Sequence, residues 1–473
     1  MDGGSFDRMT RLLVCGVSRR AGIGLALGSL LGWGGLGTGG ADAKRGANRR
    51  GDKLPCLNVG SGCVADEECC SGRCLPKSGG TGFRCGLRRR AKERGDRSEP
   101  VGCVSDVCAT GCAYTTVEAA YAAAAPGSTI YIGTGTYQTQ IAITKDMTFD
   151  ACKGEDPVLE PARISRGPDS SYSIFMEDVE PSLVPLAVTI RNLTLRGTAS
   201  GNTESDETLV SSYGHGKVNW TIDKTTIMDA SSGFNAKDGE HVFTTSRITN
   251  TGDLGVGVEA SGLMAATLSM TGTTFADNTG AGVNLVFMEA VDGMPCTAHL
   301  SECTFSGNTY APFRIYGPNS VAGRELAVAN LTDCTFTGNF GTDTVKARTS
   351  ILHVSGCTFD GNTDQESGTI YFSDSSGTVH DSTFTDNTGE YAGAISAETY
   401  TTSSVTLDVT GRSSFTSNSG TNAGAILAWK GTASDSVVVS VDDSVTFTTN
   451  TPYSCVNHVE GGSENQVNCY TWA

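Results

Sequence analysis

The chain has 473 residues, of which 60 are glycine, and only 7% of its residues are aromatic. This composition favours many short strands joined by turns over packed helices. The net charge of −17 is unevenly distributed: residues 1–100 hold 18 basic and 10 acidic residues, and residues 101–473 hold 16 and 41. Such an acidic body argues against nucleic acid as a partner, and it disfavours acidic polysaccharide unless a cation such as Ca²⁺ bridges the two.

The first 43 residues have the features of an export signal. The stretch "SRR" (18–20) precedes the mildly apolar "AGIGLALGSLLGWGGLG" (21–37), and "ADA" (41–43) offers small residues for cleavage. Paired arginines before such a segment resemble a twin-arginine signal, which implies export of a folded protein. The apolar run is shorter than the ~20 residues that span a bilayer. We therefore expect a secreted or extracellular protein with no membrane span in its mature chain.

Residues 54–86 form a cysteine-rich module. The stretch "CLNVGSGCVADEECCSGRCLPKSGGTGFRC" (56–85) has almost no large apolar side chain, so disulfides have to stabilise it. Zinc is disfavoured because the stretch holds no histidine and its cysteine doublet does not easily chelate one ion. Six cysteines permit fifteen pairings. The doublet in third and fourth place resembles the inhibitor cystine knot family. That resemblance implies the pairs Cys56–Cys70, Cys63–Cys74 and Cys69–Cys85. The charged residues 87–102 then predict a linker.

The remaining domain, residues 103–473, begins with the signals of a capped solenoid. "TTVEAAYAAAAPG" (115–127) predicts a short helix with Thr116 as its N-cap and Pro126-Gly127 as its stop. "STIYIGTGTYQTQIAITKDMTFDAC" (128–152) resembles the opening of secreted β-helices of the pectin-lyase-like kind. The helix would cover the strand edges that the first coil of such a stack exposes.

One region near the start of the coils supplies catalytic candidates. "NWTIDKTTIMDASSGFNAKDG" (219–239) resembles a strand region of pectate lyases, and this implies Asp223, Asp229 and Asp238 as candidates. Lys224 stands where that family has histidine. A lyase needs a base beside the carbon that loses its proton, and a hydrolase needs two carboxyl groups near one bond. The other acidic residues of the region are Asp206, Glu207 and Glu240. Nothing in the sequence selects a pair.

A repeated F-x-x-N element occupies the C-terminal part of the chain. Its seven copies, spaced by 30, 31, 23, 25, 31 and 32 residues, are FADN (275–278), FSGN (305–308), FTGN (336–339), FDGN (359–362), FTDN (384–387), FTSN (415–418) and FTTN (447–450). Periods of this size indicate stacked coils, and their variable length favours a parallel β-helix over helical repeats. We expect the phenylalanines to stack at ~4.8 Å. We expect the asparagines to form a second column at a turn, where they bond to one another and take left-handed backbone.

Two further features accompany each repeat. Small residues stand two places before the phenylalanines, as the inward face of a narrow strand requires: Thr273, Cys303, Cys334, Cys357, Ser382, Ser413 and Val445. Another strand follows several copies: AGVNLV (281–286), GTIYF (368–372), AGAI (392–395) and AGAIL (423–427). The paired elements resemble the repeats of the polymorphic outer-membrane protein family over residues 273–450. That resemblance implies a surface-exposed β-helix linked to adhesion.

The cysteines agree with export. Of 17 cysteines, one lies in the signal, and the even remainder is typical of oxidised pairs. We expect Cys455 and Cys469 to close a cap at the far end. Cys303, Cys334 and Cys357 fall in one column, where three thiols cannot all pair, so we expect a buried and partly reduced stack. The pairing stays open for Cys103, Cys108, Cys112, Cys152 and Cys296.

These features predict an all-β fold: a right-handed parallel β-helix with a short N-terminal capping helix, preceded by a small disulfide-rich module. The expected function is non-enzymatic binding or adhesion of a monomer to a polysaccharide or cell-surface component, without a metal or other cofactor. The alternative is a polysaccharide lyase or glycoside hydrolase, for which Ca²⁺ is the cofactor to consider. An enzyme should gather Asp, Arg or Lys side chains from adjacent coils on one face.

Overall fold

The computed structural model places Ile23–Cys103 in one compact unit and Val104–Ala473 in another. It describes residues 62–63, 74–76, 83–85, 103–162, 172–177, 185–198, 207–212, 218–259, 265–278, 284–290, 293–318, 326–400, 404–431 and 435–459. The expected export signal and linker lie outside these residues.

The cysteine-rich module contains a small antiparallel sheet. Its strands are β1 (Gly62–Cys63), β2 (Cys74–Pro76) and β3 (Phe83–Cys85), in the order β1-β3-β2. The side chains of this module, and with them the three expected disulfides, lie outside the description.

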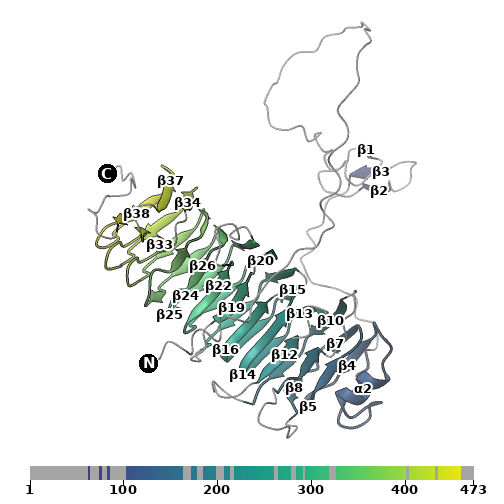
Figure 1. The fold of residues 1–473 in the computed structure, drawn as a ribbon. Coiled ribbons are helices and arrows are strands. Elements are labelled where there is room, and N and C mark those ends of the chain that lie inside the picture. The colour runs from purple at the N-terminus through teal and green to yellow at the C-terminus, as the bar shows by residue number, and fades with distance from the viewer. Residues whose placement is uncertain are drawn as a thin grey trace, which may run out of the picture. The chain divides into compact units, whose positions relative to one another are not determined.

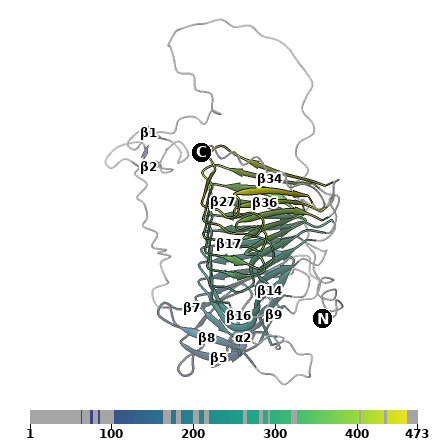
Figure 2. The same ribbon diagram turned by 90° about the vertical axis from the view of Figure 1, so that its left-hand side faces the viewer.

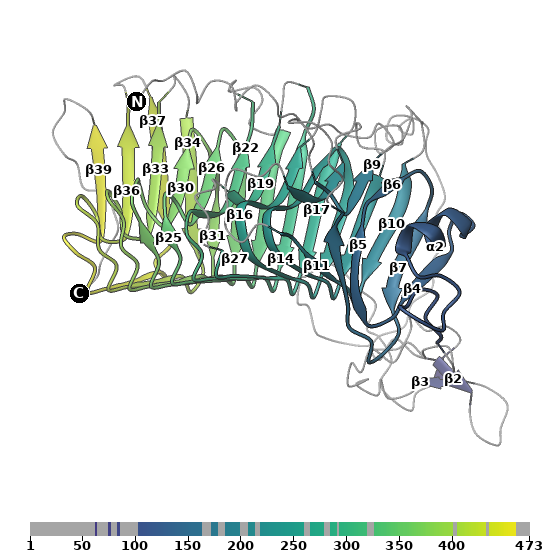
Figure 3. The same cartoon turned by 90° about the horizontal axis from the view of Figure 1, so that it is seen from below.

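The solenoid begins with the expected helix. Helix α2 (Val117–Ala123) starts at Thr116, whose hydroxyl accepts the Ala119 N–H, as an N-cap does. Its Val117 and Ala120 are buried, and Tyr121 stacks on Phe149 with ring centroids 6.0 Å apart. Figure 3 shows α2 beside β4 and β7 at this end of the stack. The helix therefore covers the first coils, as the sequence predicts.

Each coil contributes three strands to parallel ladders (Figures 1 and 2). The first strands form a twelve-stranded sheet: β4 (Thr129–Ile132), β7 (Met147–Ala151), β10 (Leu186–Arg191), β13 (Val218–Asp223), β15 (Gly239–Thr244), β17 (Ala266–Thr271), β20 (Cys296–Ser301), β23 (Ala327–Thr332), β27 (Ile351–Ser355), β31 (Ser376–His380), β34 (Ser404–Thr410) and β37 (Ser436–Val441). The second strands, which hold the phenylalanines of the repeats from β18 onward, are β5 (Gly135–Thr139), β8 (Pro157–Pro161), β11 (Thr194–Arg196), β18 (Thr274–Ala276), β21 (Thr304–Ser306), β24 (Thr335–Thr337), β28 (Thr358–Asp360), β32 (Thr383–Thr385), β35 (Ser414–Thr416) and β38 (Thr446–Thr448). The third strands are β6 (Ile141–Ile143), β9 (Phe175–Glu177), β12 (Thr208–Ser212), β19 (Asn284–Glu289), β22 (Ala311–Tyr316), β26 (Val345–Arg348), β30 (Ile370–Ser373), β33 (Ile395–Thr399), β36 (Ile426–Lys430) and β39 (Cys455–Val459). Strands β14 (Thr226–Lys237) and β16 (Arg247–Glu259) run through both the second and the third position, and β25 (Phe340–Gly341) pairs with β29 (Thr363–Asp364) in the connections between them. The predicted parallel β-helix is confirmed.

The phenylalanine column is confirmed. From Phe275 to Phe447 the neighbouring ring centroids lie 4.7–5.1 Å apart, and their planes differ by 11° or less. The rings from Phe275 to Phe415 are fully buried. Register from coil to coil is therefore maintained by a continuous aromatic stack inside the solenoid.

The asparagine column is confirmed as a hydrogen-bonded ladder. From Asn278 to Asn418, each Nδ2 donates to the Oδ1 of the next asparagine at 2.8–3.0 Å. The Nδ2 of Asn308 and of each later member also donates to the carbonyl of a preceding phenylalanine at 2.9–3.1 Å. Each Oδ1 after Asn278 accepts, in addition, the backbone N–H of the previous asparagine. The ladder thus satisfies buried polar groups that stacking alone would leave without partners.

One expectation about this corner is wrong. The left-handed residues are not the asparagines but the residues just before them: Asp277, Gly307, Gly338, Gly361, Asp386, Ser417 and Thr449, with φ between 52° and 61°. The left-handed residue makes the turn, and the asparagine that follows it is then free to point its amide into the ladder.

The cysteines agree with the predicted oxidised state and column. Cys303, Cys334 and Cys357 are free and buried. Cys108 bonds to Cys112, and Cys103, Cys152, Cys296 and Cys455 are also in disulfides. Cys469, the expected partner of Cys455, lies outside the described residues.

Candidate functional site

The outer face of the third strands carries a dense set of charged and aromatic side chains. Because side chains alternate along a strand, Val286 and Met288 point into the core while Phe287 and Glu289 face outward. Two outward register positions continue through eight coils, and we call their side chains the outer strip. The first row is Asn235, Gly257, Phe287, Arg314, Lys346, Tyr371, Ser396 and Leu427. The second row is Lys237, Glu259, Glu289, Tyr316, Arg348, Ser373, Glu398 and Trp429.

The connections between second and third strands pack along this face. Leu427 of the strip joins Ala392 and Ala423 of two connections in a small apolar cluster, and Trp429 packs against it. Several outward side chains are consequently buried, among them Arg314, which is 7% exposed. Polar side chains held in this way are largely desolvated, and this strengthens their electrostatic interactions.

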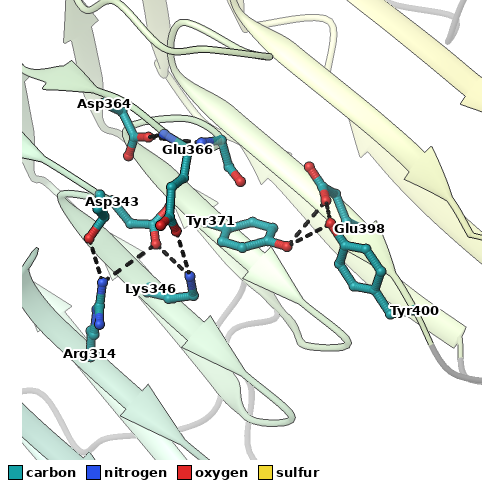
Figure 4. Close-up of polar contacts among 10 residues, drawn as sticks. Arg314, Asp343, Lys346, Asp364, Glu366, Tyr371, Glu398 and Tyr400 are labelled. Carbon is teal, nitrogen blue, oxygen red and sulfur yellow. Dashed lines mark hydrogen bonds and ion pairs between the residues drawn. The ribbon is translucent and has the colours of Figure 1, made fainter. Parts of the chain in front are cut away.

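A charged cluster lies where two adjacent connections meet the strip, and Figure 4 shows its contacts. We call Arg314, Asp343, Lys346, Asp364 and Glu366 the Asp343 cluster. Lys346 Nζ donates to Asp343 Oδ2 at 2.7 Å, and Arg314 Nη2 lies 3.9 Å from the same oxygen. Burial raises the pKa of Asp343 to about 7, although the two cations oppose the shift.

The second carboxyl of the cluster has unequal oxygens. Asp364 Oδ1 accepts the backbone N–H groups of Glu366 and Ser367 at 2.7 and 2.8 Å. Its Oδ2 is buried and has no hydrogen-bond partner among the described residues. Burial, and after it the charge of Asp343, raises the pKa of Asp364 well above its ordinary value.

A neighbouring set of hydroxyl groups surrounds Glu398. Tyr371 Oη donates to Glu398 Oε2 at 3.1 Å, the Tyr400 hydroxyl donates to the same oxygen, and Ser396 Oγ donates to Oε1 at 2.6 Å. Lys346 Nζ lies 4.7 Å from the centre of the Tyr371 ring and links this set to the Asp343 cluster. Burial raises the pKa of Tyr371, so its phenol stays a hydrogen-bond donor.

A second pair of carboxyls lies further along the strip. Glu259 and Glu289 are direct partners in adjacent coils, so their Cα atoms are ~4.8 Å apart. Burial raises the pKa of Glu259 to about 7, and Lys237, 3.7 Å away, opposes the shift. Burial and the charge of Glu259 raise the pKa of Glu289 to about 8. Arg348 and Tyr316 follow in the same row, with the guanidinium 6.0 Å from the ring centre.

Exposed aromatic side chains flank the strip. Phe340, Tyr391 and Tyr453 lie in the connections before third strands, and Tyr400 directly follows β33. They are 49%, 37%, 57% and 58% exposed, respectively. Tyr391 lies 6.1 Å from Trp429 of the strip, measured between ring centroids.

The structure separates the candidates that the sequence supplied. Asp223 ends a first strand and accepts the Thr244 hydroxyl at 2.7 Å. Asp229 lies in β14 at the corner before the third position and accepts Asn250 Nδ2 at 2.7 Å, whereas Asp238 is buried at the corner after it. The three carboxyls thus belong to different sides of the coil, and their catalytic role stays a prediction. Of the other acidic residues, Glu207 accepts from Thr198, Glu240 precedes His241 in β15, and Asp206 lies outside the described residues.

The outer strip is not among the features predicted from the sequence. A signal was present in stretches such as "FRIY" (313–316) and "TVKAR" (344–348), which alternate core apolar residues with charged or aromatic ones. In the described part of the chain, no group of three or more His, Cys, Asp or Glu side chains is placed to hold a metal. No helix of that part is long and apolar enough to cross a bilayer.

Known proteins resemble the chain in fold alone. No family model and no curated protein matches it. Among solved structures, the Streptococcus pneumoniae surface adhesin PfbA is 10% identical, with a TM-score of 0.42 over 76% of this chain and 91% of that chain. A polygalacturonase from Erwinia carotovora is 13% identical, with a TM-score of 0.38 over 74% and 96%. Pectin methylesterase PemA from Erwinia chrysanthemi is 13% identical, with a TM-score of 0.35 over 51% and 82%. The similarity is too low to transfer an activity, so function has to be argued from the site.

Proposed function

We propose that this protein is a secreted or cell-surface β-helix that binds a polysaccharide along its outer strip. The observation that carries the proposal is the set of exposed aromatic rings that flank the strip. Of the six large apolar side chains that are exposed among the described residues, four are aromatic, and all four adjoin third strands. Rings with one apolar face and a polar rim suit carbohydrate ligands, which present both C–H and hydroxyl groups.

The geometry of the strip supports a long ligand. Its polar side chains recur at one register position in adjacent coils, so equivalent donors and acceptors repeat along the solenoid axis. A polymer of similar units is able to use such a series of sites together. The resemblance of the repeats to the polymorphic outer-membrane protein family, which implies adhesion, is part of the same proposal. The same proposal includes export through the twin-arginine-like signal and action as a monomer. It also includes an accessory role for the cystine-knot-like module.

Removing the flanking rings should weaken polysaccharide binding. We expect Phe340→Ala and Tyr391→Ala each to lower affinity about fivefold, because each removes a stacking surface worth about 1 kcal/mol. Affinity electrophoresis against a panel of plant, algal and bacterial polysaccharides measures the effect. Val438→Ala is the matched control, because Val438 is also 49% exposed but lies on β37 of the twelve-stranded sheet. Equal losses in all three variants would argue against a site on this face.

A second candidate function is cleavage of the bound polysaccharide, favoured by the Glu259–Glu289 pair. Near pH 7.5, Glu259 is mostly ionised and Glu289 mostly protonated, given their pKa values of about 7 and 8. Glu289 can then donate a proton to the glycosidic oxygen as the C–O bond breaks, while Glu259 attacks the anomeric carbon, as in retaining enzymes, whose two carboxyl groups lie about 5 Å apart. Water, deprotonated by Glu289, then releases the sugar from the resulting ester. A role for Ca²⁺ in such chemistry is part of this second candidate only.

The cleavage candidate predicts a bell-shaped pH dependence. Turnover should be highest between about pH 7 and 8, because the nucleophile Glu259 is protonated below this range and the acid Glu289 is ionised above it. Glu259→Gln and Glu289→Gln should each lower the rate about 100-fold or more. Assays of reducing ends and of unsaturated products, with and without Ca²⁺, measure it. Asp408→Asn on β34 is the control. Absence of product on every glycan that the protein binds would leave binding as the function.

A further inference from the structure

We infer that the bound glycan is neutral, and that one of its sugar residues is held at the Asp343 cluster through its hydroxyl groups. The inference rests on the proposed polysaccharide binding and adds to it a substrate class and a subsite.

Three buried polar atoms of the cluster lack partners among the described residues. They are Arg314 Nε, Asp343 Oδ1 and Asp364 Oδ2. The three residues are 7%, 1% and 4% exposed. Buried polar groups in folded proteins nearly always have a hydrogen-bond partner, so three orphans in one cluster call for an explanation.

The fold itself does not require an acid at Asp364. Residues 363, 388 and 419 are bridged in register, so Gly389 and Gly420 take the place of Asp364 in the next two coils. The structural task of Asp364 is performed by Oδ1 alone, which accepts two backbone N–H groups. An asparagine would perform that task without burying an ionisable group. The second oxygen is therefore available for a ligand.

Asp343 also departs from ordinary backbone geometry. Its φ is 115°, in the region that residues with a side chain rarely occupy. Such strain persists where the surroundings hold a residue in place, and it is concentrated at binding and catalytic sites. Lys346, at 2.7 Å, holds one oxygen of the carboxyl and leaves Oδ1 without a partner.

Hydroxyl groups suit these buried, unpartnered atoms better than a carboxylate does. Arg314 Nε needs an acceptor, and Asp343 Oδ1 needs a donor. Vicinal hydroxyls of a sugar supply both, because each hydroxyl donates one hydrogen bond and accepts others. The carboxylate group of a uronate supplies acceptors alone, so that group placed here would leave Asp343 Oδ1 unpaired, and only ring hydroxyls serve both atoms.

The charges of the cluster also favour a neutral ligand. Arg314 and Lys346 face the three carboxyl groups of Asp343, Asp364 and Glu366, so the cluster has no excess of basic groups for an anion. A uronate would add a negative charge beside these carboxyls, on a body with 41 acidic and 16 basic residues. A neutral sugar avoids this cost.

The cluster is approached through Glu366. Its side chain is 53% exposed, and its contact to Lys346 Nζ is 3.5 Å long. Lys346 itself is 14% exposed. Because Glu366 is attached by one long, exposed ion pair, its side chain can rotate away at little cost and admit a sugar residue.

Calorimetry on the full chain tests the inference with two sets of probes. The neutral set is cellohexaose, mannohexaose, xylohexaose and laminarihexaose, and the anionic set is hexagalacturonate and hexamannuronate. We expect binding within the neutral set. We expect Asp343→Asn to weaken it about tenfold or more, because a hydrogen bond to a charged acceptor is lost. Asp364→Asn, which keeps the acceptor for the two backbone N–H groups, is the second variant and should also weaken binding. Glu390→Gln, an exposed carboxyl of the next connection, should leave affinity unchanged.

The results distinguish a failure of the neutral-sugar subsite from a failure of the proposed polysaccharide binding. Binding confined to the uronates would overturn the inference and leave the proposed function standing. Neutral binding that Asp343→Asn and Asp364→Asn leave unchanged, in variants whose melting temperature matches the wild type, would overturn the subsite. No binding in either set would count against the proposed function itself.

Discussion

Replacing Asn362 by alanine is expected to lower the free energy of unfolding by about 3–5 kcal/mol. The amide of Asn362 accepts both the backbone N–H and the Nδ2 of Asn339 and donates to Asn387 Oδ1 and to the Phe336 carbonyl. Its removal leaves the buried Asn339 N–H without its side-chain acceptor and takes one hydrogen bond each from Asn339 Nδ2, Asn387 Oδ1 and the Phe336 carbonyl. Urea denaturation followed by circular dichroism measures the loss.

Asn330 supplies the control for this variant. It lies on β23 of the twelve-stranded sheet, is partly exposed, and has a side-chain contact of 3.4 Å with His299 Nδ1. Asn330→Ala should change stability by less than about 0.5 kcal/mol. If Asn362→Ala were no more harmful than Asn330→Ala, the ladder would be a consequence of the fold and not a source of its stability.

Phe359→Ala should be as damaging, at about 3–5 kcal/mol. The ring is fully buried between Phe336 and Phe384, with centroid separations of 4.8 and 4.7 Å. Truncation leaves a cavity and removes two stacked contacts, each worth ~0.5–1.5 kcal/mol beyond burial. Phe359→Leu should lose less, because it keeps most of the buried volume. Thermal unfolding of the three proteins gives the series.

Phe340→Ala is the complementary variant, because its expected effects on binding and stability are the reverse of those of Phe359→Ala. Phe340 is the same residue type, but half of it is exposed, beside the outer strip. Phe340→Ala should weaken polysaccharide binding and leave the melting temperature nearly unchanged, whereas Phe359→Ala should lower the melting temperature. A Phe359→Leu protein as unstable as Phe359→Ala would mean that ring stacking, and not burial, dominates the column.

The fold could be predicted because its main interactions repeat in the sequence. Phenylalanine, asparagine and the small residue before them stay at fixed offsets within each coil, since all three belong to one short strand and the corner after it. The capping helix could also be predicted, because Thr116 and Pro126 are start and stop signals that lie beside the helix in the sequence. The prediction placed the left-handed backbone at the asparagine, whereas the structure has it one residue earlier. The sequence shows which residues tolerate that backbone and not which one makes the turn.

The outer strip could not be predicted in this way. Its residues lie beyond connections of variable length: Arg314 is nine residues after Phe305, Lys346 ten after Phe336, and Tyr371 twelve after Phe359. Aligning the repeats on phenylalanine therefore does not align the strip. The cations beside Asp343 come from two coils, Arg314 from one and Lys346 from the next. The raised pKa values of Asp343 and Asp364 arise from burial that no single repeat reveals.

The asparagine ladder has one direction, because each amide from Asn278 to Asn418 donates a hydrogen bond to the asparagine of the next coil. Each rung is interchangeable with its neighbours, so the loss or duplication of a whole repeat, such as residues 334–356, would bring new partners together with the same chemistry. Such a scaffold is free to grow or shrink in whole units over evolution. A longer or shorter descendant would inherit the same backbone design while gaining or losing positions for its ligand.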